Sequence, residues 1–420
     1  MSSETRKAIA AIADDPKAVF IALLARALHR SGVASDQLEE TITNAATFFG
    51  LQCEIFALPT NITLAVGPRY AQQIVMLRLR PARVDLRRLA LLNELFDNLE
   101  RGNTTLPQAI TALKAIDDDT QQTNPFFMIV ALAMVAIGVA VILGGGINEL
   151  IVASLIGAAT GVINALGKRM PVFDRLFEVI AAFVGTLIVA AYTHVVGPTN
   201  LYISIVAGVV LLLPGYSLTL ALHELANQDL IAGTARLGRV LVVLLSLGCG
   251  ALLGFAVAGP GFLSAMTIRP HPVGAVYWIV AVVLMSIGLS VDLNARLRDF
   301  AWVFFASFIA IATSRLFGLS PVHQIAAFLA AFACGMIANA GARFLRVPQP
   351  VILVPALNVL VPGSLSYESV LYVFSKNYMD AAQLAVNAVI AAILLVAGLL
   401  LSQLLFPATA LRSAGRNFRR

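Results

Sequence analysis

Charged residues are scarce in this chain of 420 residues. Asp, Glu, Lys and Arg together make up 12% of it, whereas hydrophobic residues make up 59%. Ordinary soluble domains are about 25% charged, so the composition excludes a soluble globular protein and predicts a polytopic α-helical protein in a lipid bilayer. The formal net charge of +6 is modest, and the basic residues cluster in loops instead of forming a stripe, which argues against a nucleic-acid partner.

Residues that carry redox, metal or catalytic chemistry are scarce as well. Cys53, Cys249 and Cys334 lie far apart with no CxxC pair, so we expect small buried hydrophobic side chains, no metal site and no cofactor. The chain contains no P-loop, no HExxH and no GxSxG, which argues against an enzyme and against ATP-driven transport by this chain alone. Its polar start lacks the apolar stretch of a signal peptide, so no cleaved leader is expected.

Residues 1–124 differ from the rest and are predicted to form a small α+β domain that ends in a linker. They hold 13 of the 29 Lys and Arg and 14 of the 23 Asp and Glu. Periodicity predicts helices at about 16–30, 35–49, 86–101 and 107–116 and strands at about 52–58, 62–66 and 74–80. We expect the Ser35 hydroxyl to cap the second helix, Gly50 to end it, and Asp117, Asp118 and Asp119 to lie in the linker.

Ten apolar segments follow, each long enough to span a bilayer. They lie at about 126–143, 147–166, 176–196, 199–222, 238–258, 273–291, 300–318, 321–341, 350–374 and 381–406. We divide them into five spans within residues 125–260 and five within 261–408, followed by a basic tail at 409–420.

Basic residues in the loops predict the orientation of these segments. Thirteen follow even-numbered segments or lie in the tail, namely Lys168, Arg169, Arg175, Arg236, Arg239, Arg296, Arg298, Arg343, Arg346, Arg412, Arg416, Arg419 and Arg420. Only Arg269, Arg315 and Lys376 follow odd-numbered segments. Because positive loops stay in the cytoplasm, we expect a multi-pass inner (plasma) membrane protein with both termini and the N-terminal domain in the cytoplasm.

A Pro-Gly pair interrupts the fourth segment of each half. The pairs are Pro214-Gly215 and Pro362-Gly363, 148 residues apart. Proline removes a helix hydrogen bond and glycine relaxes the backbone, so each pair should break its helix within the bilayer. Five spans per half make the halves run in opposite directions, and paired breaks then predict two five-helix inverted repeats around one transport site.

Polar residues beside the two breaks are the candidate substrate-binding residues, together with the Pro-Gly pairs themselves. They are Ser217, Thr219, Asn358, Ser364, Ser366 and Tyr367. The N-terminal ends of broken helices favour an anionic group, and hydroxyls and amides suit a small zwitterion. The alternative is that the prolines only kink the helices while the serines bond to the helix backbone.

Acidic residues inside apolar segments are the candidate proton-coupling residues, because charge in hydrocarbon is unfavourable unless it has a partner or a function. Glu368 follows the second break by six residues, and Glu149 begins the second segment. The alternatives are that Glu368 pairs with Lys376 near the outer surface and that Glu149 is a solvated loop residue.

The stretch 23–66 carries a recognisable pattern, followed by five spans and then five more. Its features are Ser31-Gly32-Val33, Glu39 and Glu40 in an acidic helix, Gly50-Leu51 at its end, and Pro59-Thr60 in a strand turn. With the Pro-Gly breaks, this pattern resembles the threonine/serine exporter family over essentially the whole chain. In some bacteria the two halves of that family are separate polypeptides. The resemblance implies export of threonine and serine across the inner membrane, driven by the proton motive force.

Together these features predict a secondary transporter that exports threonine and serine in exchange for protons. One alternative is a carrier of another small metabolite such as a dicarboxylate, but no Lys or Arg lies mid-span to bind it. Another is a membrane-embedded sensor or enzyme that acts through the N-terminal domain. Whether the protein forms a homo-oligomer is left open.

Overall fold

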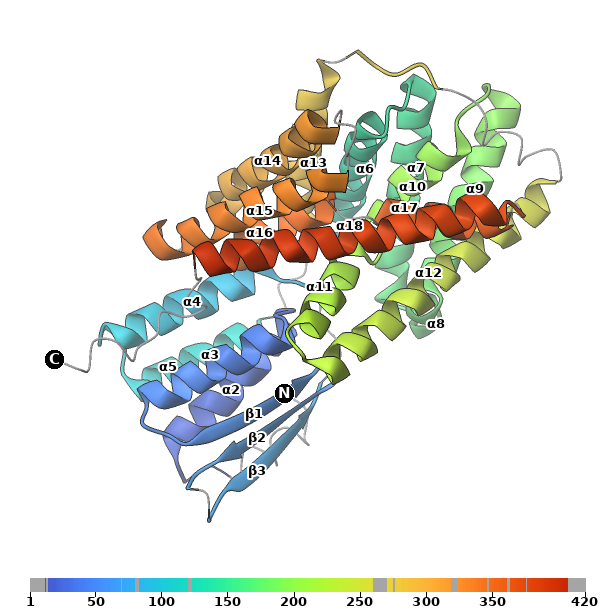
Figure 1. Ribbon diagram of the computed structural model, residues 1–420. Coiled ribbons are helices and arrows are strands. Elements are labelled where there is room, and N and C mark those ends of the chain that lie inside the picture. The colour runs from blue at the N-terminus through green and yellow to red at the C-terminus, as the bar shows by residue number, and fades with distance from the viewer. Residues whose placement is uncertain are drawn as a thin grey trace.

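The chain forms an α+β domain that packs against a bundle of apolar helices (Figure 1). The structure is a computed structural model that describes residues 12, 14–68, 70–79, 83–119, 123–259, 270–274, 276–318, 324–345, 347–360, 363–374 and 376–406. The basic tail at 409–420 lies outside the described residues.

The N-terminal domain consists of four helices and one sheet of three strands. Its elements are α2 (Pro16–Arg30), α3 (Ser35–Phe48), β1 (Cys53–Leu58), β2 (Asn61–Val66), β3 (Gln73–Arg78), α4 (Leu86–Glu100) and α5 (Leu106–Asp118). All the helices and strands predicted here are therefore confirmed, with boundaries shifted by one or two residues.

The sheet is antiparallel with strand order β1-β2-β3 and buries one face. Ile62 pairs with Leu77 and Leu64 pairs with Val75, and all four side chains are buried. Alternate residues of a strand point to opposite sides, so this buried face lies under α2 and α3, which contact the strands. The domain core thus lies between the sheet and α2 and α3, and it continues on the other side of α2, where α4 and α5 pack.

Two predictions for the domain are wrong. The Ser35 hydroxyl does not cap α3: Ser35 is the first residue of the helix, and Ala34 stands at the cap without a side-chain bond. Asp117 does not lie in a linker, since it belongs to α5 and is only 2% exposed. It binds the guanidinium groups of Arg26 and Arg30 on α2, which fastens α5 to α2.

The buried imidazole of His29 gives this domain a pH dependence. Its Nε2 donates to the Leu58 carbonyl oxygen at 3.1 Å, and its Nδ1 is buried without a partner among the described residues. Burial lowers the pKa of His29 below its usual 6.5, because a proton on Nδ1 would place a charge away from water. As the pH falls through about 6.5 the unfolded chain binds a proton that folded His29 does not, so stability falls.

We expect the His29→Gln variant to lose less stability than the unmodified protein between about pH 7 and pH 5. The amide of glutamine can still donate to Leu58 but does not titrate. Melting temperatures of both proteins in detergent, measured over this range, test the expectation. Burial raises the pKa of Glu39 in both proteins, and this raises stability as the pH falls. Only the difference between the proteins therefore reports on His29. A steeper loss in the variant would refute this account.

The helical region coincides with the ten predicted segments. Its main helices are α6 (Pro125–Ile142), α7 (Ile147–Gly167), α9 (Phe177–Val195), α10 (Leu201–Gly208), α11 (Gly215–Ala226), α12 (Leu230–Ala258), α13 (Tyr277–Asp292), α14 (Phe300–Gly318), α15 (Gln324–Ala340), α16 (Gln349–Leu360), α17 (Gly363–Phe374) and α18 (Tyr378–Leu405). Short turns of helix join them at α8 (Pro171–Arg175), η1 (Val210–Leu212), η3 (Leu297–Asp299) and η4 (Gly341–Leu345).

Fewer than ten of these segments meet the length of a membrane span. Within the described ranges, eight helices are long and apolar enough to cross a membrane, or nine if the bent pair α10 and α11 counts as one. The shortfall arises because α13 has 16 residues and because α10 and α11 meet at 58°. The helical membrane protein is confirmed, but the count of ten is not.

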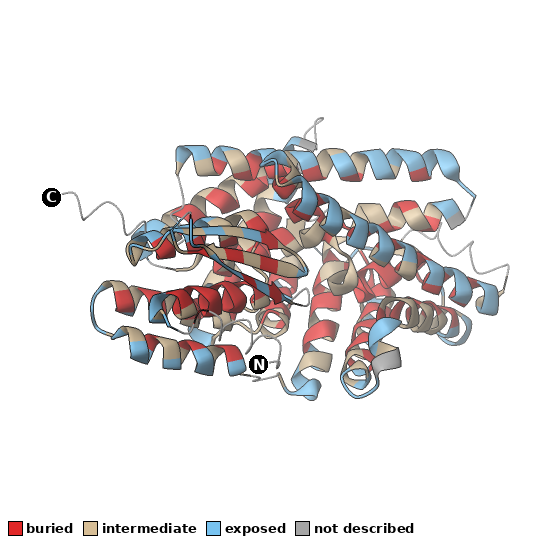
Figure 2. Ribbon diagram, turned by 90° about the horizontal axis from the view of Figure 1, so that it is seen from below, coloured by how far each residue is buried: buried red, intermediate tan, exposed pale blue. Residues whose placement is uncertain are grey.

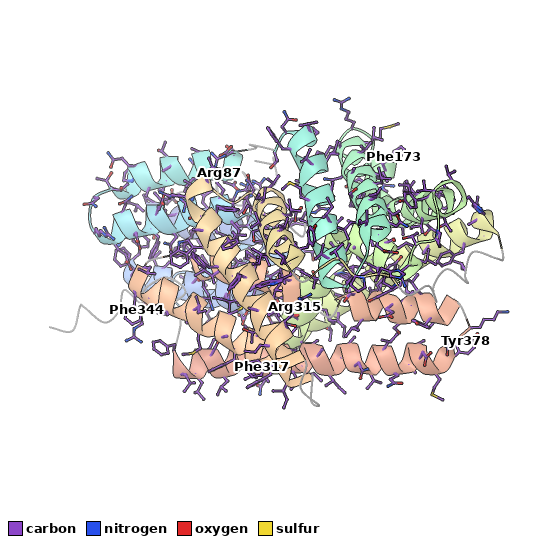
Figure 3. The ribbon with its side chains drawn as sticks, turned by 90° about the horizontal axis from the view of Figure 1, so that it is seen from above. Arg87, Phe173, Arg315, Phe317, Phe344 and Tyr378 are labelled. Atoms are coloured by element: carbon purple, nitrogen blue, oxygen red, sulfur yellow. The ribbon has the colours of Figure 1, made fainter. Side chains whose placement is uncertain are left out.

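Apolar side chains also cover the outside of the helical region, as a lipid environment requires. Figure 2 shows buried residues between the helices and exposed residues along their outer faces. Val242 and Leu245 on α12 are 63% and 62% exposed. Phe344 and Tyr378 project from the rim at helix ends (Figure 3), where aromatic rings are typical of the membrane interface.

The helices pack in two groups with matching internal contacts. We call α6 to α12 the first helix group and α13 to α18 the second. In the first, α7 contacts α6, α9 and α10, and α12 contacts α9 and α11. In the second, α14 contacts α13, α15 and α16, and α18 contacts α15 and α17. Contacts between the groups come in matching pairs as well. Helix α10 contacts α17 and α16 contacts α11, and likewise α12 contacts α17 and α18 contacts α11.

Candidate functional site

The first Pro-Gly pair breaks its helix as predicted. The chain leaves α10, passes through the turn η1, and reaches Leu213 with extended backbone angles of φ −65° and ψ 124°. Pro214 follows as the cap of α11, which begins at Gly215. The amide of Leu218 bonds to the Pro214 carbonyl oxygen, so α11 starts anew at the break and its N-terminal end points into the helical region.

The second pair falls partly outside the described residues, so its predicted break stays a prediction. Helix α16 ends at Leu360 and α17 begins at Gly363. Pro362 and the residue before it lie outside the described residues. Only the first predicted break is therefore seen among the described residues, and α16 and α17 together count as one span, Gln349–Val373.

Helix α10 meets α17, which brings together residues far apart in the sequence. The Tyr202 hydroxyl on α10 is within hydrogen-bonding range of both the Glu368 carboxylate and the Ser364 hydroxyl on α17. Glu368 is half-buried, and in the described part of the chain it forms no ion pair with Lys376. Its partner is therefore a tyrosine of the other helix group. The sequence prediction missed Tyr202, because nothing in its local context indicates a partner 166 residues away.

Thr219 and Tyr367 occupy the same position relative to their breaks, five residues after each proline. Their side chains are 1% and 0% exposed, and neither hydroxyl has a hydrogen-bond partner among the described residues. A buried hydroxyl without a partner is unfavourable by about 1–3 kcal/mol, so such groups need an explanation. Thr219 lines a cavity of about 40 Å³ between α3, α11, α16 and α18. Tyr367 is packed among apolar side chains of the first helix group.

Glu149 is held in a structural role. Its carboxylate accepts the backbone N–H groups of Gly146 at 2.8 Å and Asn200 at 2.6 Å, and the Thr199 hydroxyl at 3.0 Å. The side chain is 4% exposed, so the alternative of a solvated loop residue is wrong. These bonds fix the start of α7 to the loop that precedes α10.

The remaining predicted residues lie along the broken helices without forming one cluster. Gly215 and Gly363 are buried at the starts of α11 and α17, and Ser217, Asn358 and Ser366 are partly buried. The structure thus joins Ser364 and Glu368 around Tyr202, places Thr219 at a cavity, and leaves the others separate.

The N-terminal domain is fastened to both helix groups beside this region. On the first group, the buried Glu224 carboxylate binds Arg236 through two hydrogen bonds of 2.9 and 2.8 Å and accepts the Ser35 N–H at 3.2 Å. On the second, the Leu86 N–H donates to the Leu293 carbonyl oxygen at 3.0 Å, and Glu94 binds Arg296 at 2.9 Å. The domain therefore bridges the two groups.

Metal binding receives no support from the residues the structure describes. Among them no group of three His, Cys, Asp or Glu side chains could hold a metal ion. The polar groups near the breaks are hydroxyls, amides and one carboxylate, which can bind a small polar molecule or a proton.

Eight or nine apolar helices of spanning length, one of them broken at Pro214, define a polytopic helical membrane protein. Comparison with known families gives a more specific result. A family model described as "Putative threonine/serine exporter" matches residues 19–258, and a second, "Threonine/Serine exporter, ThrE", matches residues 278–405. The chain belongs to the threonine/serine exporter family.

Individual relatives are distant in sequence. The "Probable threonine/serine exporter" of Mycobacterium tuberculosis is 26% identical, covering 84% of this chain and 69% of that protein. "Uncharacterized protein C16A10.01" of Schizosaccharomyces pombe is 21% identical over 82% of this chain. A "Pheromone-regulated membrane protein 10" of Pichia sorbitophila is 22% identical over 83%. The chain spans 43% and 36% of the length of these two fungal relatives. No solved structure matches.

Proposed function

We propose that this protein is a secondary transporter that exports threonine and serine across the inner membrane in exchange for protons. The N-terminal domain and both termini lie in the cytoplasm, and the chain carries no enzymatic activity. Membership of the exporter family and the name of the mycobacterial relative support the substrate class. The excess of basic residues in alternate loops supports the orientation.

The matching contacts of the two helix groups support an inverted repeat. In such a repeat, α10, α11 and α12 of the first group correspond to α16, α17 and α18 of the second. A two-fold rotation then turns the contact of α10 with α17 into that of α16 with α11, and the contact of α12 with α17 into that of α18 with α11. All four contacts are present. Transporters built in this way alternate access by moving one repeat against the other around a shared site.

The contact between Tyr202 and Glu368 is the observation that carries the proposal. It joins α10 of the first helix group to α17 of the second. An ionised carboxylate accepts a strong charge-assisted hydrogen bond from a tyrosine hydroxyl, and protonation weakens it. Proton binding at Glu368 would therefore loosen a link between the groups, which couples protonation to their relative movement.

Substrate chemistry follows from the groups at the breaks. The N-terminal ends of α11 and α17 favour a carboxylate, and the unpartnered Thr219 hydroxyl can bond to a polar substrate group. A dicarboxylate would need a fixed cation here, but the guanidinium of Arg236 on α12 is already bound by Glu224. A small zwitterion fits these groups better.

Efflux from proteoliposomes tests the proposal. With an imposed pH gradient we expect labelled threonine and serine to leave vesicles that contain the unmodified protein faster than without the gradient. The Glu368→Gln variant should lose the acceleration by the gradient, because its amide does not titrate. Asp174→Asn, which removes an exposed carboxylate on α8, is the matched control and should behave like the unmodified protein.

Each part of the proposal can fail separately. Efflux that does not respond to the gradient would exclude proton antiport. A normal response in Glu368→Gln would exclude Glu368 as the coupling residue. Movement of neither amino acid would exclude the substrate assignment.

A further inference from the structure

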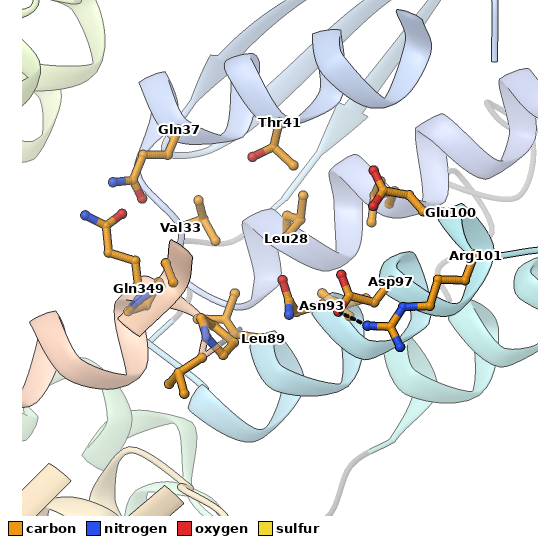
Figure 4. Close-up of a pocket in the computed structure, with 16 residues that line it drawn as sticks. Leu28, Val33, Gln37, Thr41, Leu89, Asn93, Asp97, Glu100, Arg101 and Gln349 are labelled. Atoms are coloured by element: carbon orange, nitrogen blue, oxygen red, sulfur yellow. Dashed lines mark ion pairs between the residues drawn. The ribbon is translucent and has the colours of Figure 1, made fainter. Parts of the chain in front are cut away.

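A cavity of about 250 Å³ lies where the N-terminal domain meets the helical region (Figure 4). Helices α2, α3 and α4 form one side of it, and the connection from η4 to α16 forms the other. Pockets for drug-sized ligands occupy about 300–1,000 Å³, so this cavity suits a smaller molecule. Its polar side chains are Gln37, Thr41, Asn93, Asp97, Glu100, Arg101 and Gln349.

Three charged residues line this cavity, Asp97, Glu100 and Arg101, and two of them, Asp97 and Arg101, form a weak pair that a ligand can replace. Asp97 and Arg101 lie one turn apart on α4, with 3.7 Å between carboxylate and guanidinium and side chains 29% and 48% exposed. Exposed pairs of this kind contribute little to stability. An amino acid carries an ammonium and a carboxylate on one carbon, so it can bind Asp97 and Arg101 together. A dicarboxylate would place its second acid group against Asp97.

The cavity borders the smaller one that contains Thr219. Gln37, Gln349 and Pro350 line both cavities, and Figure 4 shows the Gln37 and Gln349 side chains facing one another at this boundary. On the far side lies the Thr219 hydroxyl, buried and without a partner among the described residues. Polar groups therefore mark a route from the domain surface to the first broken helix.

We propose that the larger cavity is a capture site for a small zwitterionic amino acid, which passes from it between Gln37 and Gln349 to Thr219. The inference rests on the proposed function for its choice of ligand. Arg101 binds the ligand carboxylate, Asp97 binds the ammonium, and the amides of Gln37 and Asn93 complete the site.

Protection of an introduced cysteine from a thiol reagent tests the site in the full-length protein in detergent. The background carries Cys53→Ser, Cys249→Ser and Cys334→Ala, and the reporter is Gln37→Cys. With threonine at ten times its dissociation constant we expect labelling to slow about tenfold, because only the unoccupied site reacts. Thr43→Cys, on the exposed side of α3, is the matched control and should show no protection. Thr41→Cys replaces Gln37→Cys if the latter does not give a monodisperse protein.

A second substitution, combined with the reporter cysteine, identifies the side chains that bind the amino acid. Arg101→Gln should abolish protection by threonine, whereas Lys114→Gln, which removes an exposed charge of the same sign outside the cavity, should not. Succinate in place of threonine should not protect. Absence of protection in both cavity reporters, or equal protection of Thr43→Cys, would overturn the proposal, and protection by succinate alone would overturn the ligand class.

The protection experiment can fail or succeed independently of the efflux experiment that tests the proposed function. The Glu368→Gln protein should still show protection at Gln37→Cys although its efflux no longer responds to the gradient. Protection in a protein that transports neither threonine nor serine would support the capture site while the transport assignment failed. Normal efflux without protection would refute the capture site alone.

Discussion

Replacing Asp117 with alanine is expected to destabilise the N-terminal domain by about 3–5 kcal/mol, the usual effect of removing one partner from a buried ion pair. Asp117 is 2% exposed and Arg26 is 6% exposed, so the variant leaves a guanidinium uncompensated between α2 and α5. Arg30 also loses its bond of 2.7 Å to this carboxylate. Since whole domains are stable by only about 5–15 kcal/mol, the effect is a large fraction of the total.

Hydrogen exchange in the full-length protein measures this effect locally. Amides of α2 and α5 should exchange roughly 10²- to 10⁴-fold faster in Asp117→Ala, as a loss of about 3–5 kcal/mol requires. Glu54→Ala, which removes an exposed acid on β1, is the control and should leave these amides unchanged. The double variant Arg26→Met with Asp117→Leu should recover much of the protection, because apolar groups of similar volume can replace a buried pair. Equal effects of Asp117→Ala and Glu54→Ala would contradict a buried pair.

Asp117 also shows why some features were not predictable from the sequence. Three consecutive aspartates beside Gln121 and Asn124 are typical of a linker, and nothing local indicates partners 91 and 87 positions earlier on α2. The same applies to Ser35, whose hydroxyl was expected to cap α3. Its backbone N–H instead bonds to Glu224, 189 positions later. Side-chain partners across the fold depend on tertiary packing, which local pattern does not encode.

Features with a local cause were predictable. The strands follow from alternating apolar residues, and α2 begins where Asp15 accepts the Lys17 N–H and Pro16 sets the first turn. The break at Pro214 follows from the chemistry of one residue pair. For the candidate site, the sequence therefore identified the first break and Glu368, whereas Tyr202 and the cavities became visible only when the two helix groups were placed against each other.

Replacing Glu224 with glutamine is the second change expected to have a large effect. Glu224 is fully buried, and its carboxylate binds Arg236 on α12 through two hydrogen bonds. The amide can accept through only one atom and carries no charge, so the half-buried guanidinium loses its counter-ion. We expect a loss of about 3–5 kcal/mol, seen as a lower melting temperature and as faster exchange of the Ser35 amide, which donates to this carboxylate.

Two further variants separate a local contact from a general loss of structure. Glu40→Gln, on the exposed side of α3, should leave the melting temperature and the exchange rate of the Ser35 amide unchanged. The double variant Glu224→Gln with Arg236→Gln should be more stable than Glu224→Gln, because it removes the unpaired charge and allows an amide pair. If the double variant is no more stable than Glu224→Gln, the ion pair contributes little to the stability of the protein.

The position of this ion pair links stability to the proposed transport movement. Glu224 fastens the domain to the first helix group, and Glu94 fastens it to the second through Arg296. A large displacement of one group against the other cannot preserve both attachments unless the domain turns with one of them. If the domain follows the second group, Glu224→Gln should accelerate exchange at Ser35 while the amides of Leu86 and Arg87, which bond to residues 293 and 294, remain protected. Faster exchange at all three amides would instead mean that the domain detaches as one unit, and the two attachments would then be interdependent.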